Sequence, residues 1–181
     1  SGPLKPYARL TPKFLLAFHG EKESFYLVRL PHLLYHFWMR VFDDAPFSEE
    51  QTSPLLISEP ISAQHVDSSQ TEFLKSLGLE LEKIDEQTYA VRAVPTAIQT
   101  LPLSKFVLPL IQKILEAKET TKEEIFTSLE QSPFHEQDLP EELTPLEFET
   151  LMEKISFANL PSSVVKEISA DKLENIFFED L

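Results

Sequence analysis

Cysteine is absent from the 181-residue sequence, and glycine occurs only three times. Without cysteine the chain can form no disulfide, no thiolate nucleophile and no zinc–thiolate site. With glycine only at Gly2, Gly20 and Gly78, it can form neither a glycine-rich phosphate loop nor a G-x-S-x-G nucleophile turn. A metal site would therefore have to use histidine and carboxylate side chains.

Basic residues are also scarce, because sixteen of them stand against thirty acidic residues and give a net charge of -14. Such a charge repels a phosphate backbone, so we expect weak or no direct DNA binding. No apolar run approaches the roughly 20 residues that span a bilayer, and the start of the chain lacks the features of a secretory signal. These absences favour a cytoplasmic protein without a membrane partner. Because the first methionine is Met39, we expect a fragment of a longer protein.

Hydrophobic residues make up 42% of the chain, and their spacing predicts an α+β fold with a substantial core. Two runs rich in aromatic and aliphatic residues, 8–18 and 25–30, flank a polar turn and predict a hairpin. Pro31 then opens a helix with a broad apolar face. Polar segments containing proline, 43–53 and 131–143, indicate connections between two subdomains.

The stretch between these connections has its own pattern. An apolar run with a proline near each end, 54–61, predicts an edge strand. A helix over 68–78 and a hairpin over 79–95 follow, and two capped helices complete the stretch. Two further amphipathic helices are predicted near the end of the chain, from Thr144 and from Ser169.

Two histidines, His32 and His36, lie four residues apart on the first predicted helix, at the spacing that lets two imidazoles bind one metal ion. The glutamate that follows the first histidine in a zinc-protease helix is replaced by Leu33, and the nearest carboxylates, Asp43 and Asp44, fall in a connection. The pair is more typical of the polar edge of an amphipathic helix. A metal-dependent hydrolase using His32 and His36 is the alternative hypothesis.

Aromatic residues are abundant in the first predicted hairpin and helix, and the whole chain holds fourteen phenylalanines. Such a concentration predicts either a large apolar surface that a partner covers or a phenylalanine-rich core. Because no catalytic motif accompanies it, the sequence favours a binding module over an enzyme.

The order of several motifs resembles the C-terminal domain of the MutL family of DNA mismatch-repair proteins. The matching segments are SPLLISEPI, EFLKSLGLELEKIDEQTYAVRAVP, the YLV before the first helix, and LTPLEFETLMEKI. The sharpest of these motifs is RAVP, at residues 92–95. The resemblance covers most of the chain.

The resemblance implies two small α/β subdomains, the outer one inserted into the dimerisation one. Residues 1–50 and 144–181 would form the dimerisation subdomain, and residues 51–143 the external subdomain. It implies a homodimer that couples mismatch recognition by MutS to nicking and to unwinding by a DNA helicase, in repair complexes on the bacterial nucleoid. No cofactor is expected in this chain, because ATP and Mg would belong to an N-terminal ATPase domain outside it.

MutL proteins that cut DNA carry a metal-binding Asp-Gln-His-Ala-x-x-x-Glu-Arg segment at the start of the first helix. Aligned through YLV, this chain has Arg29 at the aspartate position and Tyr35 at the glutamate position. A cation and a phenol there remove the charge that holds a divalent ion. The resemblance therefore implies no catalytic residue in this chain and a separate, MutH-like endonuclease.

A second motif of the family, Gln-x-Leu-Leu-x-Pro in outline, binds the sliding clamp. The corresponding residues here are Ser53, Pro54, Leu55, Leu56 and Ile57, followed by Ser58. Serine replaces both the glutamine and the proline, which argues against clamp binding and favours a structural strand.

We predict that the dimer interface comes from the first hairpin and the elements packed beside it. The candidate residues are Phe14, Leu16, Phe18, Phe25, Leu27 and Trp38. Because alternate residues of a strand point to opposite faces, only some of them can contact a second copy, and the rest must be core. A monomeric adaptor domain is the third hypothesis, and it predicts no self-association.

Arg92 is a cation in the middle of a predicted strand. We expect it to pair with an acid of the neighbouring strand, such as Glu80 or Glu82. A contact with a partner of the external subdomain is the second possibility, and a contact with DNA is disfavoured by the negative charge of the chain.

Overall fold

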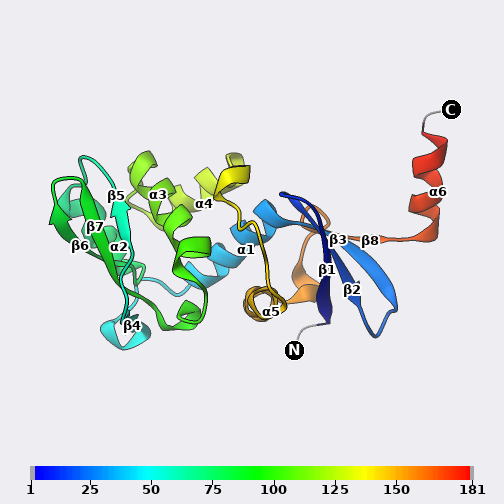
Figure 1. Cartoon of the computed structure of the whole chain (residues 1–181), viewed down its shortest axis with the longest axis horizontal. Helices are drawn as coiled ribbons and strands as arrows, with labels where there is room; N and C mark the ends of the chain where they lie inside the picture. The colour runs from blue at the N-terminus through cyan, green and yellow to red at the C-terminus, as the bar shows by residue number, and fades with distance from the viewer. Residues whose placement is uncertain (1–2, 180–181) are drawn as a thin grey trace. The chain divides into compact units, whose positions relative to one another are not determined.

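The computed structural model of the chain describes residues 3–179 (Figure 1). It divides into two compact units: unit 1 combines the two ends of the chain, up to Phe37 and from Phe134 onward, and unit 2 runs from Trp38 to Pro133. Helices and antiparallel sheets occur in both units, which confirms the α+β class. The units divide inside the first helix, whereas the sequence placed that boundary at residue 50.

Unit 1 contains a four-stranded antiparallel sheet with the order β1–β2–β3–β8. Its strands are β1 (Leu4–Thr11), β2 (Phe14–His19), β3 (Ser24–Arg29) and β8 (Val165–Ile168). The predicted hairpin is thus a three-stranded meander, because the chain also turns at Pro12 and Lys13. Strand β8 was not predicted. It pairs with β3 although more than a hundred residues separate the two in the sequence.

The helices of unit 1 begin at the capping residues that the sequence indicated. Helix α5 (Pro145–Lys154) starts after Thr144, whose hydroxyl accepts a hydrogen bond from the Glu147 N–H at 3.1 Å. Helix α6 (Ala170–Phe178) starts after Ser169 in the same way. Helix α1 (Leu30–Phe42) begins in unit 1 and ends in unit 2.

Unit 2 is built around strand β7 (Thr88–Pro95). Strand β6 (Glu80–Asp85) pairs with one edge of β7, and two short strands, β4 (Thr52–Pro54) and β5 (Pro60–Ser62), pair with different ends of the other edge. The hairpin over 79–95 is confirmed. The predicted strand 54–61 is interrupted: its two ends belong to β4 and β5, and the residues between them have no strand conformation.

Three α-helices complete unit 2: α2 (Ser68–Ser76), α3 (Leu108–Ala117) and α4 (Lys122–Gln131). A π-helical turn, Leu103–Val107, precedes α3, whose first turn contains Pro109. Short 3-10 turns occur at Glu49–Gln51, Thr96–Ile98, Glu136–Asp138 and Phe157–Asn159. Among the residues that the structure describes, no helix has the length and apolar character needed to cross a bilayer.

Candidate dimer interface

The strand register in unit 1 places five of the six candidate interface residues on one face of the sheet. Phe18 lies opposite Phe25, and Leu16 lies opposite Leu27, while Phe14 lies opposite an arginine. Directly paired residues of antiparallel strands share a face. All five are only partly buried by their own chain. We call this surface the open face.

The other face of the sheet is covered. Its residues alternate with those of the open face along β2 and β3, and they are almost fully buried: Leu15, Ala17, His19, Tyr26 and Val28. Helix α5 contacts β1 and supplies buried apolar residues to unit 1, among them Phe148 and Leu151. One face of the sheet is therefore core, and the open face lacks an equivalent cover within the described chain.

Aromatic contacts extend the open face onto β1. The Phe18 and Phe25 rings lie 5.1 Å apart, and the Tyr7 ring meets Phe25 edge-on at the same distance. Tyr7 nonetheless keeps 68% of its surface accessible. Tyr7 lies two residues after Lys5, which pairs with Phe18 on this face. On the opposite edge of the sheet, Ile168 of β8 pairs with Phe25 and extends the same surface.

Three cations border the apolar centre of the open face. Lys5 pairs with Phe18, Arg29 with Phe14, and Lys166 with Leu27, and all three cations are exposed. A large apolar centre with a polar, charged rim is the usual composition of a protein–protein interface.

Trp38, the sixth candidate, is not part of this surface. It has no accessible area and stacks on Phe42 at a centroid distance of 5.5 Å, inside unit 2. A side chain without accessible surface cannot contact a second copy, so Trp38 is a core residue. The sequence could not separate the two roles, because a helical apolar stripe looks the same in a core and in an interface.

The sequence of residues 21–133, more than half of the chain, matches the family described as "MutL C terminal dimerisation domain". The chain belongs to this family. No curated protein matches it. The match begins just before β3 and includes all of α1 and unit 2. It confirms, at the level of the family, the resemblance seen in the sequence. The chain is therefore a dimerisation module of the MutL mismatch-repair type.

The residues that the resemblance aligns with the MutL endonuclease segment are Arg29 at the end of β3 and Tyr35 in α1. The exposed Arg29 guanidinium lies 3.2 Å from Nε2 of His32, and burial, with Arg29 and His36 nearby, lowers the pKa of His32. A cation at the imidazole nitrogen competes with a metal ion for it. Within residues 3–179, no three histidine or acidic side chains are placed to hold a metal ion.

The segment that corresponds to the MutL clamp motif begins in a strand and continues as a loop. Strand β4 ends at Pro54, and beyond the half-buried Leu55 the side chains of Leu56 and Ile57 are 103% and 83% exposed. Ser53 remains in β4, where its hydroxyl lies 2.8 Å from that of Thr96. The expectation of a structural strand holds for Ser53 and Pro54 and is wrong for residues 55–57, which lie between β4 and β5.

Arg92 holds the base of this loop. Its guanidinium pairs with Glu82 on β6, one of the two acids expected, and Nη1 donates a hydrogen bond to the Ser58 hydroxyl at 3.2 Å. Its carbonyl also accepts a hydrogen bond from the Leu55 N–H at 2.8 Å. A single arginine in mid-strand therefore links two strands to the loop that carries Leu56 and Ile57.

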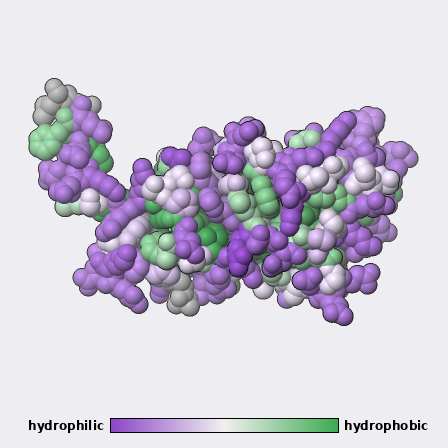
Figure 2. All heavy atoms as spheres, turned by 180° about the vertical axis from the view of Figure 1, so that it is seen from behind, coloured by the Kyte–Doolittle hydropathy of each residue, from purple (hydrophilic) through white to green (hydrophobic). Residues whose placement is uncertain are grey.

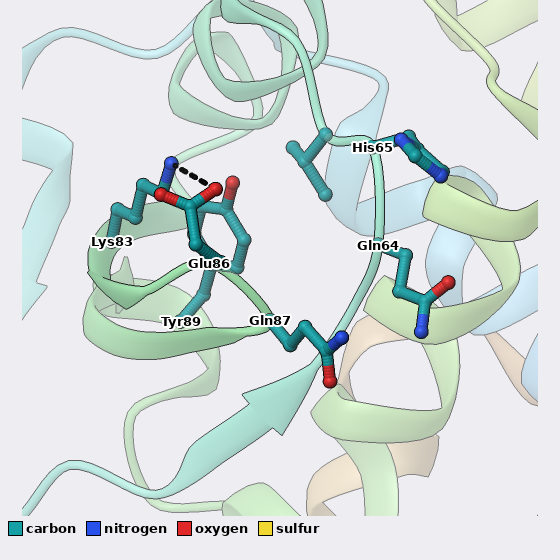
Figure 3. A pocket seen from close by; sticks show the side chains of 7 residues that line it. Gln64, His65, Lys83, Glu86, Gln87 and Tyr89 are labelled. Atoms are coloured by element: carbon teal, nitrogen blue, oxygen red, sulfur yellow. Dashed lines mark ion pairs between the residues drawn. The ribbon is translucent and has the colours of Figure 1, made fainter.

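A pocket of about 400 Å³ lies between the loop after β5 and the β6–β7 hairpin (Figure 3). Gln64 and His65 line one side of it, and Tyr89 and an ion pair of Lys83 with Glu86, 3.6 Å long, line the other. The charges of the lining cancel, so the pocket favours neither an anion nor a cation. No motif pointed to this pocket, because its residues come from segments without one.

Proposed function

We propose that two copies of the chain associate through the open face, and that the resulting dimer is the clasp of a MutL protein. The single observation that carries this proposal is the sheet register, which gathers Phe14, Leu16, Phe18, Phe25 and Leu27 on one uncovered face of unit 1. The family match supports self-association in general, and the register supports this surface in particular. Burial of apolar area would supply most of the free energy of association.

The dimer would act between the recognition of a mismatch and the cutting of the DNA strand. It would hold together two MutL chains that couple a mismatch recognised by MutS to nicking by a separate, MutH-like endonuclease and to unwinding by a helicase. The replacement of the acidic metal positions by Arg29 and Tyr35 supports a non-nicking role. The net charge of -14 supports contacts with proteins rather than with DNA.

The decisive experiment is sedimentation of the chain over a dilution series, with and without EDTA. The proposal predicts a dimer that persists to low micromolar concentration and is insensitive to the chelator. A monomer at all concentrations would refute it and favour the adaptor hypothesis. A dimer that EDTA dissociates would instead favour a metal-dependent assembly and support His32 and His36 as metal ligands.

The exposure of Leu56 and Ile57 favours a second function, the docking of unit 2 on an apolar pocket of a partner protein. A sliding clamp is the partner that the resemblance suggests, although the glutamine and proline of the motif are missing. Surface plasmon resonance against an immobilised clamp tests this, with a Leu56→Asp/Ile57→Asp variant as the comparison. Binding that the variant loses supports the function; absent or unchanged binding refutes it.

A further inference from the structure

Helix α6 has an apolar side that its own chain leaves uncovered. Leu173, Ile176 and Phe177 recur with helical spacing and so share one side, with 48%, 58% and 79% of their surfaces exposed. No residue of α6 is buried. Figure 2 shows hydrophobic side chains at the surface of this helix. Because a nine-residue helix is marginal alone in water, a second surface is needed to stabilise it.

The connection to β8 keeps α6 off its own sheet. Only Ser169 separates the end of β8 from the start of α6. The Ser169 hydroxyl caps the helix by accepting a hydrogen bond from the Lys172 N–H at 3.3 Å, and Lys172 Nζ donates to the Glu167 carbonyl at 2.7 Å. Folding α6 back onto the sheet of the same chain would require a reversal within one residue and the loss of the hydrogen bond from Lys172 Nζ to β8.

The open face is complementary to α6 in both polarity and charge. Its apolar centre matches the apolar side of the helix, and its border carries Lys5, Arg29 and Lys166. Helix α6 carries Glu174 next to its apolar side, and its one lysine is engaged with a carbonyl of β8. In a chain with an excess of acids, a basic border beside an acidic helix favours their contact.

We propose that α6 is an exchanged arm: in the homodimer, the apolar side of α6 from each chain packs on the open face of the other chain. This inference rests on the proposed function, since it names the part of the second copy that covers the open face. A helix of this length measures about 13 Å, and the three strand spacings of the sheet about 14 Å, so one arm spans the sheet. In a dimer with two-fold symmetry, the contact between α6 of one chain and the open face of the other occurs twice.

The first test compares dimer dissociation constants by sedimentation. An Ile176→Asp/Phe177→Asp variant is expected to weaken the dimer by on the order of a hundredfold, since it brings two charges to an apolar contact in each arm. Asn175→Asp, on the opposite side of the helix, is the matched control and should keep the parent value. A parent dimer that the double variant leaves equally tight overturns the arm while the proposed function stands; a monomeric parent refutes the proposed function itself.

The second test uses the absence of native cysteine. One chain carries Leu16→Cys or Leu27→Cys, and the other chain carries Ile176→Cys. The two chains are mixed, their dimers are left to exchange subunits, and the mixture is then oxidised. Mass spectrometry identifies the disulfide-linked products. Mixed disulfides with either sheet position are expected, and Asn175→Cys should form far fewer. Equal yields from both helix positions, no mixed disulfide, or an intramolecular bond in a chain carrying both cysteines would overturn the exchange.

Discussion

Leu16 and Leu27 lie directly opposite each other on β2 and β3, and neither is buried by the chain itself. Because the pair lies on the open face, a charge there would be desolvated when a second copy binds. We expect Leu16→Glu to raise the dimer dissociation constant roughly a hundredfold or more. Sedimentation measures this, and Leu146→Glu is a matched control, since Leu146 is 72% exposed on α5 in the same unit. Equal weakening by both would contradict the assignment of the open face.

Gly78 is the one described glycine with a left-handed backbone, at φ 78°. A Cβ atom there would lie 2.8 Å from Cγ of Pro95 and 3.2 Å from Cδ2 of Phe47. We expect Gly78→Ala to reduce the free energy of unfolding by about 1 to 3 kcal/mol, from backbone strain together with the close contacts. Urea denaturation measures the change. Gly20→Ala, which meets no atom within 4 Å, should change stability little.

Glu119 is 4% exposed, and its Oε1 atom has no hydrogen-bond partner. Burial raises the pKa of this carboxyl group. Since the unfolded chain releases the proton at a lower pH than the native state does, stability falls as the pH rises from the ordinary carboxyl pKa to the raised one. We expect Glu119→Gln to raise the midpoint of thermal unfolding at pH 7.5 and to reduce its dependence on pH. Glu116→Gln, at an exposed position nearby, should do neither.

Leu56 and Ile57 contribute exposed surface rather than core, so their removal should not destabilise unit 2. We expect Leu56→Ser/Ile57→Ser to change the free energy of unfolding by less than about 0.5 kcal/mol. A loss of 2 kcal/mol or more, as for buried aliphatic residues, would show that the loop packs in solution. Chemical denaturation distinguishes the two results.

Arg92 is expected to act on the loop more than on stability. Its side chain and that of Glu82 are both about half exposed, so Arg92→Ala should cost less than about 1 kcal/mol. Without the guanidinium, Ser58 loses one anchor, and amide hydrogen exchange over residues 55–59 should become faster. Unchanged exchange there would contradict the anchoring role. Lys83→Ala, in the neighbouring ion pair of Lys83 with Glu86, is the control.

Local patterns predicted the parts of the fold that local forces determine. The helix after Pro31, the hairpin over 79–95 and the cap at Thr144 follow from periodicity, turn residues and side-chain hydrogen bonds within a few positions. Five of the six interface candidates share one face of the sheet, because strand alternation is a local property. The family to which the chain belongs was recognised from motif order.

The errors arise where distant segments decide the structure. Strand β8 is only four residues long, and its pairing with β3 stabilises it. No local sequence pattern indicates this pairing. Residues 54–61 have the pattern of one edge strand, yet only the two ends of this stretch pair with β7, and Leu56 and Ile57 lie in the loop between them. Trp38 was assigned to the interface because the sequence does not show which buried surface a helix stripe joins.

The pairing of β3 with β8 also sets an order of events during synthesis. Unit 2 is one continuous stretch, residues 38–133, and all its contacts are available once that stretch has left the ribosome. The sheet of unit 1 stays one strand short until residue 168 emerges. We therefore expect unit 2 to fold first and the surface for a second copy to be completed last, which would protect nascent chains from pairing before they are finished.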